Sequence, residues 1–447
     1  SGHPIVNRGS SDSFVKVPGL VYVCFLAVDA HPSHEYTMEA EITRHALDRV
    51  PLSIIFDDST MLVNLNYFFL QDRIARDREY GETNVVESNQ RWQDLPVVHP
   101  ESFTREFAEY CLEHGVKGKY SVVPFPAALG RIDEGLDLFS KQQQESWLQM
   151  CRELIVPNYD ITPEMMTHTY VVDLDTLKPV DPNLWEQWGW NQLPVDQEEL
   201  VTRYIATACR ILDNVGLTPD GVTSPGGFGN PLDFYAKCAE QAVRSVTGNP
   251  TPYLFKRVSA DGAVETPVWY PDREAETAMG EIIACVGDYT GSWTGFGEVN
   301  VSKYITEDLQ GGRLPAVIDA GDPCVLISHW QGFYGLHNED RRGFNAFKTI
   351  VRRLEARDPN GERTLWRKPS EVTTYAIARE MADVTANGST FSIDLPIQVP
   401  EFTLRLTGTE VRSVSVDGVP LTLANGRATF ENNSYYHEGD ATLVAFT

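Results

Sequence analysis

Over residues 50–380, short apolar segments alternate with segments of helical periodicity, and this alternation constrains the fold more than any other feature. The segments Ser53–Phe56 and Pro323–Trp330 are short and rich in aliphatic residues, as expected of buried strands. Residues 100–116 and 196–217 instead place apolar side chains at the spacing of one helix face. Strands that alternate with helices indicate a parallel β/α architecture, either an open sheet or a closed barrel.

From about residue 386 the pattern changes to short alternating strands that are separated by Asp-Gly and Asn-Gly turns. No helical periodicity follows, which predicts a second, small all-β domain that resembles a β-sandwich. We therefore expect three parts: an N-terminal extension over residues 1–50 that packs on the barrel, a β/α catalytic domain over 51–384, and the β domain over 385–447.

Charge and the length of the apolar runs exclude several classes of partner. The chain has 63 acidic and 37 basic residues, a formal charge of −26, which repels nucleic acid and anionic lipid surfaces. The longest apolar run, Gly19–Val28, is about half as long as a membrane span. The 7 cysteines form no C-x-x-C pair, so a cysteine-based zinc site or redox motif is not expected.

Polar residues follow several of the predicted strands at the ends where β/α folds bind ligands. Asp57 and Asp58 end the first strand, His168 follows a later one, and a Ser224–Gly227 turn and His329 follow two more. In a β/α fold, ligands contact the residues at the carboxyl ends of the strands. Two carboxylates and two imidazoles from separate strands are suited to a divalent metal with an acid–base pair.

The order of these segments resembles the polysaccharide deacetylase family, also called the NodB-homology fold, from about Pro51 to His329. The family fold is a distorted (β/α) barrel, which the resemblance implies for this chain. The segment F-D-D-S is similar to the family's T-F-D-D-G motif, and L-I-S-H is similar to its L-x-H motif. The resemblance implies that Asp57 is a general base, Asp58 a metal ligand and His329 the general acid.

The resemblance also implies a divalent metal, with zinc as the expected ion. The segment E-M-M-T-H-T-Y-V-V is similar to the family's H-[ST]-x-x-H motif, with His168 as the first histidine ligand. The second histidine of that motif corresponds to Val172, so we expect Asp173, or His99 on an earlier loop, to complete the ligands. T-S-P-G-G is similar to the R-x-P motif, with Ser224 in place of the arginine.

Aromatic residues cluster in three segments close in sequence to these polar groups, and they predict a carbohydrate groove. Sugar rings stack on aromatic faces while their hydroxyl groups need polar partners. We expect a polysaccharide or oligosaccharide substrate, bound by Pro225, Gly226, Trp188, Trp190, Trp293 and Trp330. Small β modules often accompany secreted carbohydrate enzymes, so a secreted or periplasmic location is expected after removal of a leader, with a cytoplasmic location as the alternative.

The predicted function is metal-dependent removal of an acyl group, most simply acetyl, from a polysaccharide or oligosaccharide. Two alternatives stay open. The first is a metal-independent glycoside hydrolase or lyase, in which Asp57 or Asp58 faces Asp288 or Glu298 across a groove. The second is a carbohydrate-binding protein without catalytic activity on the same fold.

Overall fold

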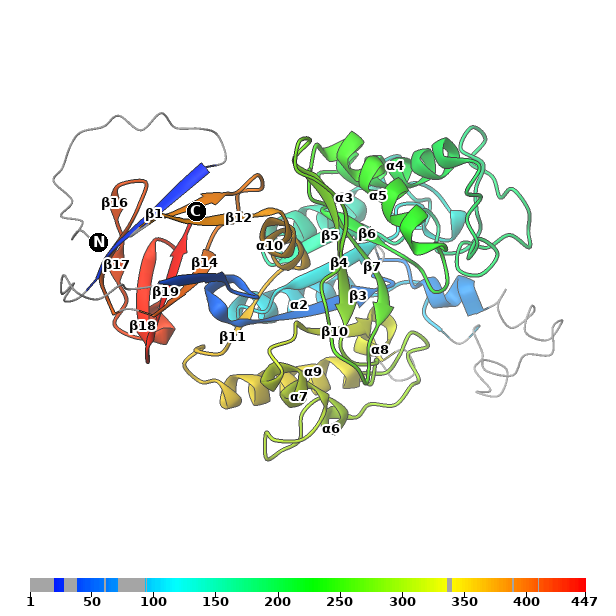
Figure 1. The fold of residues 1–447 in the computed structure, drawn as a ribbon. Helices are drawn as coiled ribbons and strands as arrows, with labels where there is room; N and C mark the ends of the chain where they lie inside the picture. The colour runs from blue at the N-terminus through cyan, green and yellow to red at the C-terminus, as the bar shows by residue number, and fades with distance from the viewer. Residues whose placement is uncertain are drawn as a thin grey trace.

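The computed structural model describes residues 20–27, 38–59, 62–70, 93, 95–335, 340–387, 390–408 and 410–447. The described chain forms a β/α region and a separate group of β-strands on one side of it, with helix α10 (Pro369–Met381) where the two parts meet (Figure 1). The predicted mixed α/β class and the predicted C-terminal strands are both confirmed.

Two sheets of mainly parallel strands form the centre of the β/α region. The first sheet has the order β10–β3–β4–β5, and β11 pairs with the start of β3: β10 (Cys324–His329), β3 (Val50–Asp57), β4 (Gly118–Val122), β5 (Tyr159–Pro163) and β11 (Thr364–Trp366). The second has the order β6–β7–β9–β8, with β8 antiparallel: β6 (Gly221–Thr223), β7 (Tyr253–Val258), β9 (Thr277–Ala284) and β8 (Val268–Asp272).

The two sheets meet at two seams, but their ladders do not join into one closed barrel within the described strands. At one seam Glu164, just after β5, forms a single parallel bridge with Thr223 of β6. At the other, the N–H of Cys285 donates to the carbonyl of Val325 at 2.7 Å. An apolar cluster that includes Ile55 and Phe255 has members from both sheets. The sheets therefore enclose a shared core without a continuous hydrogen-bonded ring.

Strand β3 shows how this core sets the direction of each side chain. All eight of its residues are buried, as expected for a strand that is covered on both faces. Phe56 packs against Phe107 and Phe333 in the layer of helices, whereas its neighbour Ile55 belongs to the core that the sheets share. Because successive side chains of a strand point to opposite faces, Asp57, two residues after Ile55, faces the same shared interior.

Helices cover the outer faces of the strands (Figure 1). The predicted helices 100–116 and 196–217 correspond to the observed α2 and α4, each with a buried apolar face. The helices of this layer and their bounds are α2 (Glu101–Glu113), α3 (Lys141–Met150), α4 (Glu198–Asn214), α5 (Leu232–Thr247), α6 (Val301–Tyr304), α7 (Arg313–Asp319), α8 (Trp330–Tyr334) and α9 (Arg342–Arg357). No helix in the described part of the chain is long and apolar enough to cross a lipid bilayer.

The β domain has two five-stranded sheets, and each includes one strand from the start of the chain. Strand β1 (Leu20–Ala27) pairs with β13 and β15, and β2 (Glu39–Ile42) pairs with β14. Strands β1 and β2, from the predicted N-terminal extension, thus belong to the sheets of this domain, while Arg44, just after β2, pairs with Asp322 of the β/α region at 2.6 Å. The other strands are β12 (Asp383–Asn387), β13 (Thr390–Asp394), β14 (Phe402–Thr407), β15 (Val411–Val416), β16 (Val419–Pro420), β17 (Thr422–Leu423), β18 (Ser434–Glu438) and β19 (Ala441–Phe446).

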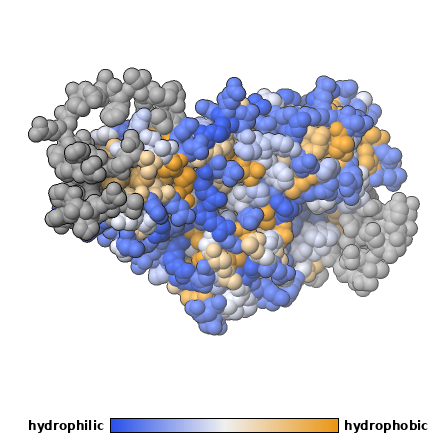
Figure 2. Space-filling view, viewed as in Figure 1, coloured by the Kyte–Doolittle hydropathy of each residue, from blue (hydrophilic) through white to orange (hydrophobic). Residues whose placement is uncertain are grey.

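Helix α10 connects the two parts through its side chains. Val372 belongs to the apolar core between the β/α sheets, while Tyr375 and Met381 belong to the core of the β domain. The Tyr375 hydroxyl lies 3.0 Å from Oγ1 of Thr43, which adds a polar contact at this junction. On the face seen in Figure 2, hydrophilic residues surround the apolar patches.

Candidate active site

The candidate site lies where strands β3, β5 and β10 end. Strands β3 and β10 are parallel neighbours, and their register places Asp57 opposite His329. Asp58 directly follows β3, and Glu164 directly follows β5. The carboxyl ends of these strands therefore bring together polar side chains from three distant parts of the sequence, as predicted for Asp57, Asp58, His168 and His329.

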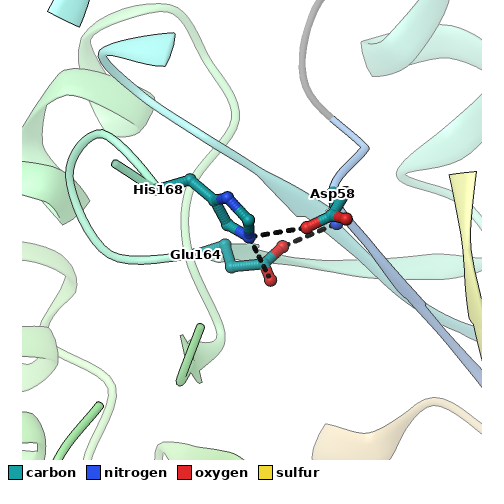
Figure 3. Close-up of side chains that lie close together, drawn as sticks. All are labelled: Asp58, Glu164 and His168. Carbon is teal, nitrogen blue, oxygen red and sulfur yellow. Dashed lines mark hydrogen bonds and ion pairs between the residues drawn. The ribbon is translucent and has the colours of Figure 1, made fainter. Parts of the chain in front are cut away.

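Asp58, Glu164 and His168 form a compact buried cluster (Figure 3). Nε2 of His168 lies 2.6 Å from Oδ1 of Asp58 and 3.4 Å from Oε1 of Glu164. The backbone N–H of Asp58 donates to Oε2 of Glu164 at 2.7 Å. Each residue offers a possible ligand atom, and these atoms lie within 4.8 Å of one another. The residues are only 4%, 2% and 6% exposed, so the cluster is shielded from bulk water.

The carboxylate that joins Asp58 and His168 is Glu164 and not Asp173, which was expected from the sequence as a further metal ligand. Asp173 lies in an exposed turn, where its Oδ1 accepts hydrogen bonds from the backbone N–H groups of Asp175 and Thr176. Val172 is buried. In the metal motif the two ligands are four residues apart. In this chain the second polar residue is Glu164, four residues before His168, whereas the residue four positions after it is Val172. The E-x-x-x-H pattern of Glu164–His168 was the sequence signal for this arrangement.

His99, the other residue proposed to complete the ligands, lies outside the cluster. Its ring packs edge-on against Tyr334, with centroids 5.1 Å apart. Both ring nitrogens are buried and have no hydrogen-bond partner among the described residues. Burial lowers the pKa of His99 to about 3, so the ring is neutral.

The backbone around the cluster is strained. Asp58, Met165 and His168 have φ angles of +57°, +50° and +62°, in the left-handed region that residues other than glycine rarely adopt. Such conformations each cost on the order of 1–3 kcal/mol and persist only where the surrounding structure enforces them. Three of them lie within or next to the cluster, where the contacts of the surrounding loop hold them in place.

Glu186 is the residue that holds the 164–168 loop. Its buried carboxylate accepts hydrogen bonds from the backbone N–H groups of Met166, Thr167 and His168, and from the hydroxyl of Tyr204. Burial raises the pKa of Glu186 to about 7, although these hydrogen bonds act in the opposite direction. Glu186 could not be recognised from the sequence, because nothing in its Trp-rich segment distinguishes it from a surface carboxylate.

The charges of the cluster suit a divalent cation. Burial alone would lower the pKa of His168, but the carboxylates of Asp58 and Glu164 outweigh burial and raise it well above the usual value. The imidazole therefore carries a proton between two carboxylates when no other cation neutralises them. Two carboxylates and one imidazole are also ligands that zinc and other divalent metals accept, and such a metal would displace that proton.

Asp57 forms a buried ion pair that the sequence analysis did not predict. Nζ of Lys119, on β4, lies 2.6 Å from Oδ1 of Asp57, and the lysine is fully buried. Burial raises the pKa of Asp57, while the charges of Lys119 and His329 oppose that rise. The alternation along β3 explains the contact, because it directs Asp57 toward the interior that Lys119 also faces.

His329 forms a second acid–base pair, with Asp288. Nδ1 of His329 lies 2.8 Å from Oδ2 of Asp288. The backbone N–H and hydroxyl of Thr290 donate to Oδ1 of Asp288, at 2.8 and 2.7 Å, and fix that carboxylate. Burial would lower the pKa of His329, but Asp288 more than offsets it and raises the pKa to about 9. His329 is thus protonated at neutral pH and retains partial exposure.

Two of the four predicted tryptophans lie close to the cluster. The ring of Phe69 lies 5.8 Å from those of both His168 and Trp188, and 5.7 Å from that of Trp293. Trp188 also stacks on Trp185, with centroids 4.7 Å apart and an angle of 14° between the rings. Trp188 and Trp293 are half-buried, so part of each ring is accessible beside the site.

The other two tryptophans are core residues, which corrects their assignment to substrate binding. Trp330 is 1% exposed and packs against Phe103 and other aromatic rings of the helix layer. Trp190 is 8% exposed and packs against Tyr204 and Phe228. Both indoles are thus enclosed by aromatic neighbours and present no ring face to a substrate.

The predicted proline–glycine turn lies near the cluster. Pro225 is buried and Gly226 is exposed, and the hydroxyl of Ser224 closes the turn by donating to the carbonyl of Phe228 at 2.6 Å. A Cβ on Gly226 would lie 3.2 Å from Oε1 of Gln187, whose Nε2 is 3.1 Å from Nδ1 of His168. The side chain of Gln187 thus lies between the turn and His168 of the cluster.

No known family model matches the chain, and no curated protein matches it in sequence. Among solved structures, a T48 deacetylase with bound substrate aligns over 72% of this chain and 90% of its own, with 8% identity and a TM-score of 0.30. An exo-β-1,4-mannosidase from Opitutaceae bacterium strain TAV5 aligns over 70% of this chain and 62% of its own, with 11% identity and a TM-score of 0.32. At these values the alignments do not establish a common fold, so the chemistry of the site is inferred from its own residues.

Proposed function

We propose that the protein is a metal-dependent hydrolase that removes an acyl group, most simply acetyl, from an N- or O-acylated sugar. The observation that carries this proposal is the buried Asp58–Glu164–His168 cluster, whose possible ligand atoms lie within 4.8 Å of one another. An arrangement that keeps two carboxylates and an imidazole together at the cost of three strained backbone positions is expected of a ligand set. Zinc is the ion we propose, because it accepts oxygen and nitrogen ligands of these types.

The residues around the cluster can carry the proton transfers of acyl hydrolysis. A divalent cation, when bound, supplies a Lewis acid that polarises a carbonyl and acidifies water. Asp57, the carboxylate next to Asp58, accepts a proton from the attacking water. His329, which Asp288 keeps protonated at neutral pH, donates a proton to the departing oxygen or nitrogen of the sugar. Base and acid come from neighbouring strand ends, which suits a reaction that needs both.

A sugar substrate is supported by the aromatic surroundings of the cluster. Trp188 and Trp293 each keep part of a ring accessible and contact Phe69, which also contacts His168. A pyranose ring that stacks on either indole would lie beside the proposed reacting centre. The strongly negative chain disfavours polyanionic substrates, so a neutral or cationic sugar chain fits better than an acidic one.

Glycosidic cleavage, the main alternative, has weaker support in the geometry. Asp288, proposed as one of its carboxylates, has both oxygens engaged, by His329 and by Thr290. Glu298 is exposed and accepts a hydrogen bond from Asn300. Neither residue is placed as a free carboxyl group opposite Asp57, as the two-carboxylate mechanism would require.

Product analysis tests the proposed reaction. Purified protein, loaded with zinc, is incubated with acetylated xylo- and chito-oligosaccharides, and the products are identified by mass spectrometry. Release of acetate with an intact sugar chain, abolished by a strong chelator and restored by zinc, is the expected result. Shortened sugar chains that form equally well with the chelator present would contradict the proposal in favour of a glycosidase. As a control, the Asp173→Asn variant alters an exposed carboxylate and should behave like the wild type.

A further inference from the structure

Lys119 is a fully buried lysine whose ammonium group lies between the two β/α sheets. It has three polar partners from three strands: Oδ1 of Asp57 at 2.6 Å, Oγ1 of Thr223 at 2.7 Å and Oγ of Ser121 at 3.1 Å. An ammonium group has three protons to donate, and these three contacts can use all of them. A buried charge is costly unless it is paired in this way, so a lysine at this position depends on these three partners.

The partners of Lys119 define the orientation of the Asp57 carboxylate. The lysine engages Oδ1, and Ser121, whose hydroxyl donates to the Phe56 carbonyl at 2.7 Å, lies 3.4 Å from the same oxygen. Among the described residues, no hydrogen bond engages the other carboxylate oxygen, Oδ2. Asp57 therefore has one oxygen anchored in the interior and one left for other contacts. Its side chain is 8% exposed to solvent.

We propose that Lys119 is a positioning residue for the hydrolytic reaction: its ammonium group anchors Oδ1 of Asp57, so that Oδ2 faces the reacting water. The inference rests on the proposed function, in which Asp57 accepts a proton from that water. Lys119 itself touches neither substrate nor ligand atoms and acts only through Asp57. A proton acceptor must be held within hydrogen-bond reach of its proton, and a misplacement of about 1 Å can cost about 100-fold in rate.

The test compares Lys119→Met, Lys119→Arg and a matched control, Lys117→Met, in steady-state kinetics on the acetylated oligosaccharide that the wild type hydrolyses. Lys117 lies two residues before Lys119 in the sequence, but it is half-buried and pairs with Glu371, away from the cluster. Lys119→Met is expected to lower kcat about 100-fold. KM and the zinc content should stay near the wild-type values, because substrate and cluster contacts are unchanged. Lys119→Arg, which keeps a cation near Asp57, should recover part of kcat, and Lys117→Met should retain all of it.

A double-mutant cycle separates positioning from a general effect on the fold. In an Asp57→Asn background, Lys119→Met should lower kcat no further, because the residue through which it acts is already disabled. A loss that persists undiminished in that background overturns the inference, as does a Lys119→Met protein with zinc bound and kcat within twofold of wild type. If Lys119→Met does not fold, Thr223→Val, which removes one anchor of the ammonium group, must lower kcat with KM unchanged; an unchanged kcat overturns the inference. A wild-type protein without hydrolytic activity overturns the proposed function as well, whereas an active wild type with an unaffected Lys119→Met overturns this inference alone.

Discussion

Replacing Glu186 by alanine tests whether the 164–168 loop is held in place by one buried carboxylate. The change leaves the N–H groups of Met166, Thr167 and His168, and the hydroxyl of Tyr204, without their acceptor. Each buried donor left unpaired costs about 2 kcal/mol, so the four together cost about 8 kcal/mol. Removing a carboxylate whose pKa burial raises from 4.5 to about 7 returns about 3 kcal/mol at neutral pH. The net expectation is a loss of about 5 kcal/mol in the free energy of unfolding.

Guanidinium denaturation in the presence of a chelator, followed by tryptophan fluorescence, measures this loss without a contribution from metal. Calorimetric titration with zinc then measures the second effect, a decrease in affinity of about 10- to 100-fold, because the loop no longer orients His168 and Glu164. Glu198→Ala is the matched control, since Glu198 is partly exposed and pairs with Lys237 on the helix surface. A Glu186→Ala protein within about 0.5 kcal/mol of wild type and with unchanged zinc affinity would refute the reasoning.

Further predictions concern His329 and the aromatic residues. The pKa of His329 is raised from 6.5 to about 9, so its pairing with Asp288 stabilises the fold fully below pH 6.5 and is lost as the pH rises through 9. The difference in unfolding free energy between wild type and Asp288→Asn should therefore be largest below pH 6.5, at most about 3 kcal/mol, and should close above pH 9 in a denaturation series; a constant difference would contradict this. Asp288→Asn should also move the alkaline limb of the kcat profile to lower pH. Trp188→Ala should raise KM about tenfold with kcat nearly unchanged, and it should lower the melting temperature less than Trp190→Ala does, because Trp188 is only half-buried; equal effects of both on stability would contradict the placement of Trp188.

Local patterns in the sequence predicted the strand ends of the site well. Asp57, Asp58 and His329 follow runs of buried aliphatic residues, and parallel strands place their carboxyl ends together. Glu164 was missed because a four-residue spacing can be counted in either direction from His168. Met165 and His168 have a left-handed backbone, which turns the loop back toward Asp58. Their sequence does not predict this conformation, because methionine and histidine rarely adopt it.

Other parts of the structure depend on contacts between distant segments. Strand β1 pairs with β13 and β15, nearly the whole chain away, so its membership of the β domain could not be inferred from its own residues. Lys119 is a charged residue in a short strand, and only the enclosing second sheet shows that it faces inward. Trp188 and Trp190 are two residues apart, yet one is half-buried near the site and the other packs in the core.

Metal stoichiometry of three purified proteins tests the central claim most directly. Wild type, Glu164→Gln and Asp173→Asn are dialysed against zinc and then metal-free buffer, and bound zinc is measured by inductively coupled plasma mass spectrometry. The buried cluster of Asp58, Glu164 and His168 predicts about one zinc per chain for wild type and for Asp173→Asn, and a large loss for Glu164→Gln. A wild type that retains no zinc, or a Glu164→Gln protein that retains as much as wild type, would contradict the account.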